Sequence, residues 1–113
     1  MLQRSKRHPS IEPHHPAETI SEDVLPGLGM SKLAFAKALG VSRQTLHDLL
    51  TQKQGVSAQM AVRLEAVIGG SAEMWLNLQA AHDLWHARRK VDTSKLKRLR
   101  AVDAVDEGET TAS

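Results

Sequence analysis

Histidine side chains are the groups in this sequence whose spacing comes nearest to a chemical site. His82 and His86 are four residues apart, which places two imidazoles on one helix face at the spacing of paired metal ligands. The sequence lacks the Glu at the second position of the metalloprotease motif, and it offers no obvious third ligand. His8, His14 and His15 lie in a polar segment, where solvated side chains are expected. We therefore expect no metal site.

The other common catalytic patterns do not occur. The chain contains no cysteine, which excludes a disulfide scaffold, a Cys-ligated metal and a thiol nucleophile. His82 and Asp83 are not accompanied by the Gly-x-Ser-x-Gly elbow of a hydrolase triad. The pair Gly69-Gly70 does not belong to a phosphate-binding glycine motif. The sequence therefore predicts a binding protein with no enzymatic activity and no cofactor.

Length and composition indicate one small domain. The chain has 113 residues, of which 41% are hydrophobic, and this is enough to build a core. No apolar run approaches the roughly 18 residues of a membrane span, and residues 1–15 contain no signal-peptide segment. We therefore expect a cytoplasmic protein with no membrane partner. The net charge of +2 conceals basic blocks at 31–55 and 86–100 and acidic blocks at 16–30 and at the C-terminus.

Hydrophobic residues recur at helical spacing, and no useful stretch alternates with period two. The expected fold is an all-α, five-helix bundle. Pro16 suits the first position of the first helix, and Pro26 and Gly27 are expected to end it. Gly40 and Gly69-Gly70 are expected to end two later helices. The first helix is expected to begin at Pro16. The other four are expected to begin after the cap residue Ser31, after the cap residue Ser42, after the Gly-Val-Ser triplet at 55–57 and after the cap residue Ser71. The last helix is expected to run to about Lys90.

The connection between the second and third expected helices is very short. Leu39-Gly40-Val41-Ser42 contains too few residues for antiparallel helices, so the two must cross steeply. Ala36 is small where the helices touch, Gly40 permits the turn, and Leu46 anchors the third helix in the core. The sequence therefore predicts a helix-turn-helix unit.

The third helix is expected to enter the major groove of double-stranded DNA. Its leucines share one face at about 100° per residue, and polar residues lie opposite. Gln44 can pair with adenine through two hydrogen bonds, and Asp48 can accept from N4 of cytosine. The alternative is a merely solvated helix face. The expected DNA contacts are Ser42, Arg43, Gln44, Thr45, His47, Asp48, Thr51, Lys32 and Lys53.

Four stretches of the sequence match a known family pattern. They are 15–18 (HPAE), 39–43 (LGVSR), 60–64 (MAVRL) and, most specifically, 75–85 (WLNLQAAHDLW). On these stretches, about 70 residues between His15 and Trp85 resemble the HigA-type antitoxins, a branch of the Xre family with a lambda-repressor-like fold. Two positions depart from the family pattern: Ala17 stands where the family usually has Gly, and Lys32 stands where many relatives carry a phosphate-contacting Gln.

The resemblance implies a homodimer that binds a palindromic operator in its own promoter and neutralises a small RelE-like ribonuclease toxin. A stand-alone Xre-type repressor without a toxin is the alternative, and a small basic reading frame beside the gene would favour the antitoxin. A third possibility is a protein-interaction module whose helix-turn-helix no longer binds DNA. In that case Gln44→Ala and Arg43→Ala would leave promoter binding unchanged.

The fifth helix carries two apolar stripes, which is more than a small bundle needs to cover one side of a terminal helix. One stripe includes Trp85, and tryptophan is enriched at interfaces. The second stripe consists of Leu76, Ala80 and Leu84. We expect this helix to form the dimer interface, the alternative being that both stripes belong to the protomer's core. The expected dimer residues are Met74, Trp75, Leu78, Ala81 and Trp85.

Acidic surfaces are the expected contacts for a cationic toxin. Glu18, Glu22 and Asp23 on the first helix are ranked above the acidic C-terminus, although acids near a helix start also compensate its dipole.

Three regions are expected along the chain. Residues 1–14 form a flexible arm, residues 15–90 the DNA-binding and dimerisation domain, and residues 91–113 a basic and then acidic tail. Within the tail, Ser94 to Val105 has the spacing of a weak amphipathic helix, with disorder as the alternative.

Overall fold

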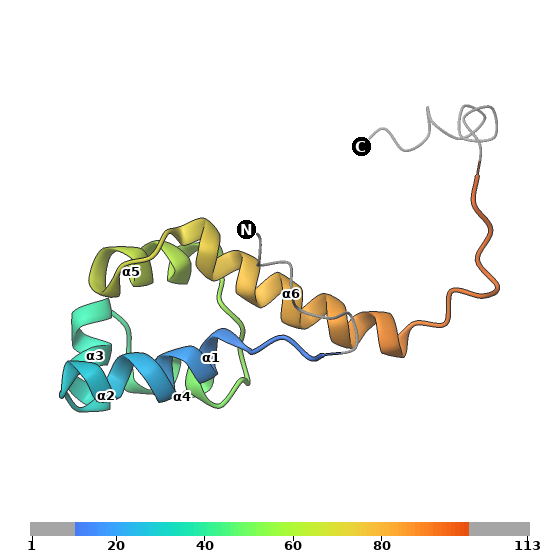
Figure 1. The fold of residues 1–113 in the computed structure, drawn as a ribbon. Helices are drawn as coiled ribbons and strands as arrows, with labels where there is room; N and C mark the ends of the chain where they lie inside the picture. Colours follow the sequence, from blue (N-terminus) through green and yellow to red (C-terminus); the bar gives the residue numbers. More distant parts are fainter. Residues whose placement is uncertain (1–10, 100–113) are drawn as a thin grey trace, which may run out of the picture.

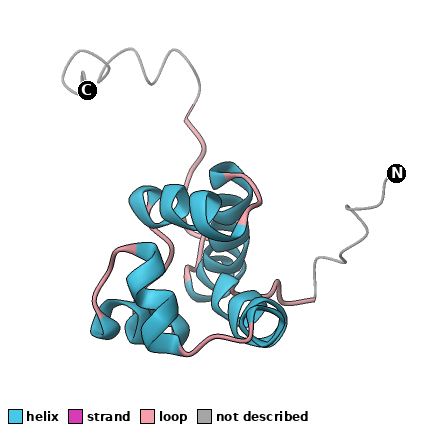
Figure 2. Ribbon diagram, turned by 90° about the vertical axis from the view of Figure 1, so that its left-hand side faces the viewer, coloured by secondary structure: helices cyan, strands magenta, loops and turns pink. Residues whose placement is uncertain are grey.

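The computed structural model describes residues 11–99, and all regular secondary structure within this range is helical (Figures 1 and 2). The first expected helix comprises three elements that follow one another without a break, and the other four expected helices are single elements. The fold is therefore the predicted all-α bundle of five helical segments. The first segment consists of α1 (Pro16–Thr19), η2 (Ile20–Val24) and α2 (Leu25–Leu28). The other four segments are α3 (Lys32–Leu39), α4 (Arg43–Leu50), α5 (Ala58–Ile68) and α6 (Ala72–Lys90).

The end of the first helical segment was predicted wrongly. The helix continues past Pro26 and Gly27 to Leu28, and Gly29 closes it in the left-handed conformation with φ of 66°. The turn before Pro26 is π-helical, with the backbone N–H of Leu25 bonded to the carbonyl of Ile20. This wider turn accommodates a residue that has no N–H and a bulky ring.

Serine side chains begin the remaining helices. Ser31, Ser42, Ser57 and Ser71 each accept a hydrogen bond from the backbone N–H three residues later, at 2.9–3.1 Å. Each cap satisfies one donor that the first turn of a helix leaves unpaired. The predicted starts of these four helices are therefore confirmed.

One hydrophobic cluster joins all the helical segments. Phe35 and Leu64 are completely buried, and Trp75 donates its indole N–H to the carbonyl of Gly69 at 2.9 Å. A buried tryptophan needs such a partner for its N–H. The cluster consists of Ile20, Phe35, Ala36, Leu39, Leu46, Leu49, Val56, Met60, Ala61, Leu64 and Trp75.

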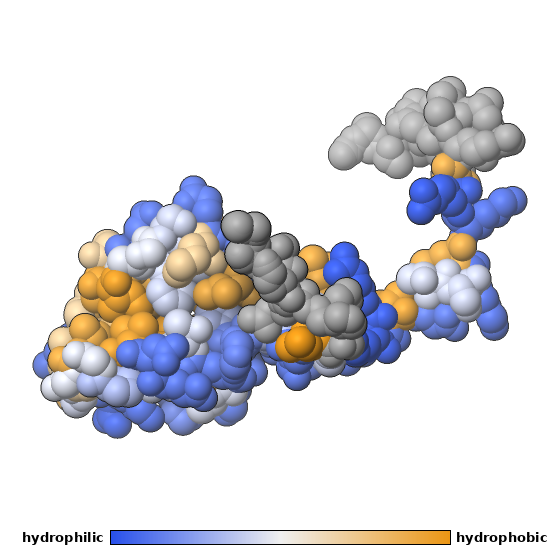
Figure 3. All heavy atoms as spheres, viewed as in Figure 1, coloured by the Kyte–Doolittle hydropathy of each residue, from blue (hydrophilic) through white to orange (hydrophobic). Residues whose placement is uncertain are grey.

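Helix α6 packs along α5 at its beginning and then extends beyond the rest of the bundle (Figure 1). Residues 11–15, which precede α1, run beside this extended part of α6 (Figure 1). At the opposite end of the molecule, hydrophobic residues gather on the surface where α3 and α5 lie (Figure 3). The exposed side chains Leu28, Met30, Leu33 and Val62 are large and hydrophobic.

Two further features concern the ends of the described chain. Residues 91–99 contain a turn near Ser94 and no helix, and the rest of the segment from Ser94 to Val105 lies outside the described residues. Residues 1–10 of the expected arm also lie outside the described residues, whereas Glu12 of this arm contacts His86.

Among the described residues, no helix has both the length and the apolar character that crossing a membrane requires.

Candidate nucleic-acid interface

Helix α4 is held by its apolar face and presents its polar face outward. Leu46 and Leu49 are each 1% exposed and belong to the core, and Leu50 is half-buried against it. Arg43, Gln44 and His47 are exposed. The backbone N–H groups at the start of α4 form the positive end of the helix dipole, which suits a phosphate oxygen. This is the arrangement that the leucine spacing predicted.

The turn before α4 depends on a side chain from α5. Gly40 adopts φ of 75°, and the backbone N–H of Val41 returns to the carbonyl of Ala36 at 3.0 Å. Arg63 donates from Nη1 to the carbonyl oxygens of Leu39, at 2.8 Å, and Gly40, at 3.4 Å. A cation at the carboxyl end of α3 stabilises carbonyls that have no partner within the helix. Sequence reasoning missed Arg63, although it lies in the family-like stretch 60–64.

Gln44 and Asp48 form a pair on the outer face of α4. The Gln44 amide nitrogen Nε2 donates to Asp48 Oδ1 at 2.8 Å. The pair lies one helical turn apart, which is the spacing at which side chains meet on a helix. One N–H and the carbonyl oxygen of Gln44 remain for another partner, and so does the second oxygen of Asp48.

The threonines and Ser42 make local bonds. Ser42 Oγ donates to Thr45 Oγ1 at 2.8 Å while accepting from the backbone N–H of Thr45. Thr51 Oγ1 donates to the carbonyl of His47 at 2.8 Å. Thr51 therefore closes the end of α4, which the sequence did not indicate.

Basic groups lie on both sides of the α3–α4 junction. Lys32, Arg43 and His47 line one shallow hollow between the two helices, together with Leu33 and Leu46. The hollow brings together Lys32 and Arg43, the first residues of the two helices.

Lys53 lies apart from that hollow, in the loop after α4. The loop turns at Gln52, whose φ is 65°, and the backbone N–H of Lys53 donates to the carbonyl of Asp48 at 2.8 Å.

Gln79 fixes the loop between α4 and α5 to helix α6. Its side chain is 8% exposed, its Oε1 accepts from the backbone N–H of Val56 at 2.8 Å, and its Nε2 donates to Asp83 at 3.0 Å. Gly55 lies so close that a Cβ there would be 2.7–2.9 Å from the Gln79 amide. Sequence reasoning missed this role, although Gln79 lies in the family-like stretch 75–85.

The residues expected to form a dimer interface do not share one environment. Trp75 is 3% exposed and packs in the protomer's own core, so we leave it out of the proposed dimer surface. Leu78 and Trp85 are half-buried, whereas Met74 and Ala81 are exposed. Leu84 of the second stripe is exposed as well, and Arg89 stacks on Trp85 at 3.4 Å from the ring centroid.

The three acids expected to contact a toxin lie together. Glu18, Glu22 and Asp23 line one shallow hollow with Thr19 and His14. Glu18 is paired with the imidazole of His14 at 2.6 Å, which reduces the free charge of this surface when that histidine is protonated.

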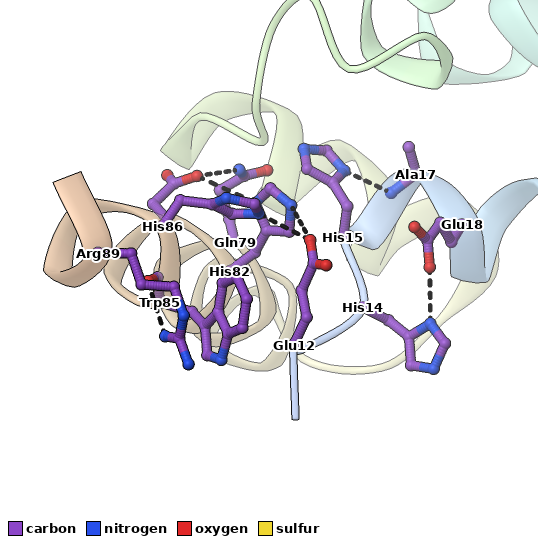
Figure 4. A network of polar contacts seen from close by, with 11 residues as sticks. Glu12, His14, His15, Ala17, Glu18, Gln79, His82, Trp85, His86 and Arg89 are labelled. Atoms are coloured by element: carbon purple, nitrogen blue, oxygen red, sulfur yellow. Dashed lines mark hydrogen bonds and ion pairs between the residues drawn. The ribbon is translucent and has the colours of Figure 1, made fainter. Parts of the chain in front are cut away.

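His15 is buried and caps α1. Its Nδ1 accepts from the backbone N–H of Ala17 at 2.9 Å, and its ring meets that of His82 edge-on (Figure 4). Burial lowers the pKa of His15, and the neighbouring His82 lowers that pKa further. The side chain therefore favours its neutral form.

Comparisons with known proteins agree with this geometry. Residues 27–75 match the helix-turn-helix family HTH_3. An Escherichia coli protein described as the uncharacterized HTH-type transcriptional regulator YddM is 43% identical over 84 residues, which cover 74% of this chain and 88% of that protein. The antitoxin HigA-1 of Vibrio cholerae is 34% identical over 90 residues, covering 79% of this chain and 80% of that protein.

A solved structure of the antitoxin GraA has a TM-score of 0.74 and 38% identity, and the match covers 80% of this chain and all of GraA. GraA in complex with its operator has a TM-score of 0.69 and 35% identity, with 89% of this chain and all of that chain covered. Regulators and antitoxins of this kind are DNA-binding proteins and not enzymes. The chain belongs to the Xre-type helix-turn-helix family HTH_3, and its relatives include the HigA and GraA antitoxins.

Proposed function

We propose that this protein is a HigA-type antitoxin that binds an operator in its own promoter, represses its operon and neutralises a RelE-like ribonuclease toxin. One observation carries the DNA-binding part. Helix α4 has a buried leucine face and a capped start, and its exposed polar face lies beside the basic hollow of Lys32, Arg43 and His47. The likeness to GraA, whose complex with its operator is known, supports the same assignment.

Base reading is assigned to the Gln44–Asp48 pair. After donating to Asp48, the Gln44 amide retains one N–H and its carbonyl oxygen. These two groups match N7 and N6–H of adenine in the major groove. The free oxygen of Asp48 can accept from N4 of a neighbouring cytosine.

Phosphate contacts are assigned to the surrounding groups. The capped start of α4, with Ser42 and Thr45, is assigned to one phosphate, and so are the side chains of Lys32, Arg43 and His47 in the hollow between α3 and α4. Lys53, in the loop after α4, is assigned to another phosphate. Thr51 is assigned a supporting role at the end of α4.

Fluorescence anisotropy with the labelled upstream region tests this part. Gln44→Ala is expected to weaken binding about 5- to 150-fold, because it removes a base contact worth about 1–3 kcal/mol. Arg43→Ala is expected to weaken binding to all sequences alike, because it removes a phosphate contact. Lys90→Ala is the matched control, since it removes a positive charge at the far end of α6. Absence of binding by the unmodified protein at low salt would leave the protein-interaction module as the better assignment.

A homodimer is proposed because a palindromic operator requires two recognition helices. In such a dimer the two copies of α4 lie about 34 Å apart in successive major grooves. The proposed surface combines half-buried and exposed apolar side chains of α6, which would bury further area against a second copy. These side chains are Met74, Leu78, Ala81 and Trp85.

Light scattering after gel filtration tests the dimer. Ala81→Glu places a charge in the centre of the surface and is expected to give a monomer, whereas Glu73→Ala on the same helix is the control. A monomeric unmodified protein would contradict the proposal.

Toxin binding is assigned to Glu18, Glu22 and Asp23, because their acidic hollow suits a cationic ribonuclease. Co-expression with the product of the adjacent gene tests this assignment through co-purification and loss of ribonuclease activity. Glu22→Lys is expected to weaken the complex by charge reversal at an exposed position. Such a complex would form in the cytoplasm, where the operator lies.

The second candidate is a stand-alone repressor, and the description of YddM as a transcriptional regulator favours it. This candidate predicts operator binding without any toxin partner. Retention of operator binding by a protein that captures no adjacent gene product would select it.

A further inference from the structure

The segment before α1 brings a carboxylate to the paired histidines of α6. Glu12 Oε2 lies 2.7 Å from His86 Nε2 and 3.7 Å from His82 Nε2. The ligand atoms of these three residues all lie within 4.8 Å of one another. Figure 4 shows the Glu12 carboxylate beside the two imidazole rings, which lie on the same side of α6.

We propose that Glu12, His82 and His86 form a binding site for a divalent transition-metal ion of the zinc class. Two imidazole nitrogens and one carboxylate oxygen are ligands that zinc takes in proteins, with a fourth position left for water or another ligand. Nothing in the sequence pointed to a third ligand for the histidine pair. Glu12 supplies this third ligand, although it lies 70 residues upstream of His82 in the sequence. The segment before α1 lies against α6 and so brings Glu12 to the histidine pair.

The present distances are close to those between the ligand atoms of a bound zinc ion. Ligand atoms bonded to tetrahedral zinc at about 2.0–2.1 Å stand about 3.3 Å from one another. The two measured separations, 2.7 Å and 3.7 Å, lie on either side of that value. The ligand nitrogens of His82 and His86 lie within 4.8 Å of each other, so side-chain rotations are expected to bring all three atoms around one ion.

A second layer of hydrogen bonds orients His82. Its Nδ1 lies 3.4 Å from Asp83 Oδ1, so that Nε2 faces Glu12. Asp83 is held in turn by Gln79 Nε2 at 3.0 Å, and Gln79 is anchored to the backbone N–H of Val56 at 2.8 Å. A carboxylate behind the ring of a ligating histidine fixes the ring and makes it a better ligand.

Burial and charge also fit the site. The side chain of His82 is 16% exposed, whereas those of His86 and Glu12 are 44% and 50% exposed, so one side of the site is open to an incoming ion. Glu12 and Asp83 together balance the charge of a divalent cation. His15 lies against His82 but is not a ligand through Nδ1, because that nitrogen accepts from Ala17.

The competing explanation is a plain hydrogen bond between His86 and Glu12, which uses the same atoms without an ion. The two explanations differ in what Glu12→Gln does. Glutamine retains the size of the side chain and the ability to hydrogen bond with His86, but it removes the anionic oxygen that a metal requires. Because Glu12 is half-exposed, this variant is expected to fold, which circular dichroism verifies.

The experiment is calorimetric titration of tag-free, EDTA-treated full-length protein with zinc chloride. One zinc ion per protomer is expected to bind the unmodified chain. Glu12→Gln is expected to lower the affinity at least tenfold, and Asp83→Asn by about 10–100-fold through the orientation of His82. His14→Ala is the matched control, because it removes a neighbouring histidine that pairs with Glu18 instead, and its affinity should equal that of the unmodified chain.

Thermal unfolding gives an independent measurement, since an ion that binds only the folded state raises the Tm. Zinc is expected to raise the Tm of the unmodified chain more than that of Glu12→Gln, and magnesium is expected to leave both unchanged because it prefers oxygen ligands. The proposal is overturned if zinc does not bind, if Glu12→Gln binds it as tightly as the unmodified chain, or if His14→Ala removes the binding.

Discussion

Arg63 of α5 donates a hydrogen bond to the carbonyl oxygen of Leu39, the last residue of α3, at 2.8 Å. A second contact from the same Nη1 reaches the Gly40 carbonyl at 3.4 Å. The turn of the helix-turn-helix is therefore stabilised by a third helix, in addition to its own glycine. In the proposed DNA complex, the direction in which α4 leaves this turn would set its approach to DNA, so Arg63 of α5 is expected to affect recognition indirectly.

Removal of that contact should affect stability and DNA binding together. Arg63→Ala is expected to lower the free energy of unfolding by about 1–2 kcal/mol, because a charged donor is lost from carbonyls at a helix end. Urea unfolding measures this change, and anisotropy measures the accompanying loss of operator affinity. Arg88→Ala, an exposed arginine near the end of α6, is the control. Equal stability of the two variants would contradict the role assigned to Arg63.

Gly55 and Gln79 should be strongly coupled. Gly55→Ala would place a Cβ 2.7–2.9 Å from the Gln79 amide and is expected to cost about 1–3 kcal/mol through overpacking. Gln79→Ala leaves the buried N–H of Val56 unpaired and is expected to cost a similar amount.

The double variant distinguishes this explanation from two independent losses. Without the Gln79 amide, the three atoms nearest to the new Cβ are absent, so Gly55→Ala should cost much less in that background. A double-mutant cycle by urea unfolding measures the coupling. Strict additivity of the two losses would show that the contact between Gly55 and Gln79 is unimportant.

The salt dependence of operator binding should separate phosphate contacts from base contacts. Lys32→Ala is expected to reduce the slope of log affinity against log salt by about 0.9, because one fewer counterion is released. Gln44→Ala is expected to leave that slope unchanged while relaxing the preference for adenine at one position. Anisotropy titrations at several salt concentrations measure both. A change of slope in Gln44→Ala alone would reverse these two assignments.

In protein that EDTA has freed of metal, His15 should make the free energy of unfolding depend on pH. Its pKa is lowered in the folded state, mainly by burial. As pH falls below about 6.5, the unfolded chain therefore takes up a proton at this residue more readily than the folded chain. The free energy of unfolding should fall over that window, by at most about 1.4 kcal/mol per pH unit from this group.

His15→Asn isolates this effect, because asparagine also caps a helix but does not titrate. Urea unfolding at pH 7.5 and at pH 5.5 should show a smaller loss of stability in the variant than in the unmodified chain. If both lose the same amount, His15 is not a source of the pH dependence.

Local features of this molecule were predictable from the sequence, and long-range contacts were not. Ser31, Ser42 and Ser71 act within three residues of themselves, so their caps follow from type and position. Pro26 misled the prediction because the usual rule assumes an α-helix, whereas the preceding turn is π-helical. Ile20, whose carbonyl accepts the π-helical hydrogen bond, is completely buried, and sequence spacing alone does not reveal this arrangement.

The same distinction between local features and long-range contacts holds for the candidate DNA-binding and metal sites. The polar face of α4 was predicted from the positions of its leucines, because one buried face determines the other. Arg63, Gln79 and Glu12 act on residues that are 23 or more positions away. Their partners are identified by the fold, and a single sequence indicated them only as members of family-like stretches or, for Glu12, not at all.

The contact between Glu12 and His86 has a consequence for the order in which the protein is completed on the ribosome. The two residues are 74 positions apart, and His86 follows every other helical segment. At 5–20 residues per second, synthesis reaches His86 roughly 4–15 s after Glu12. During that interval the segment before α1 has no α6 to lie against. This contact can therefore form only after the helix-turn-helix residues have been synthesised.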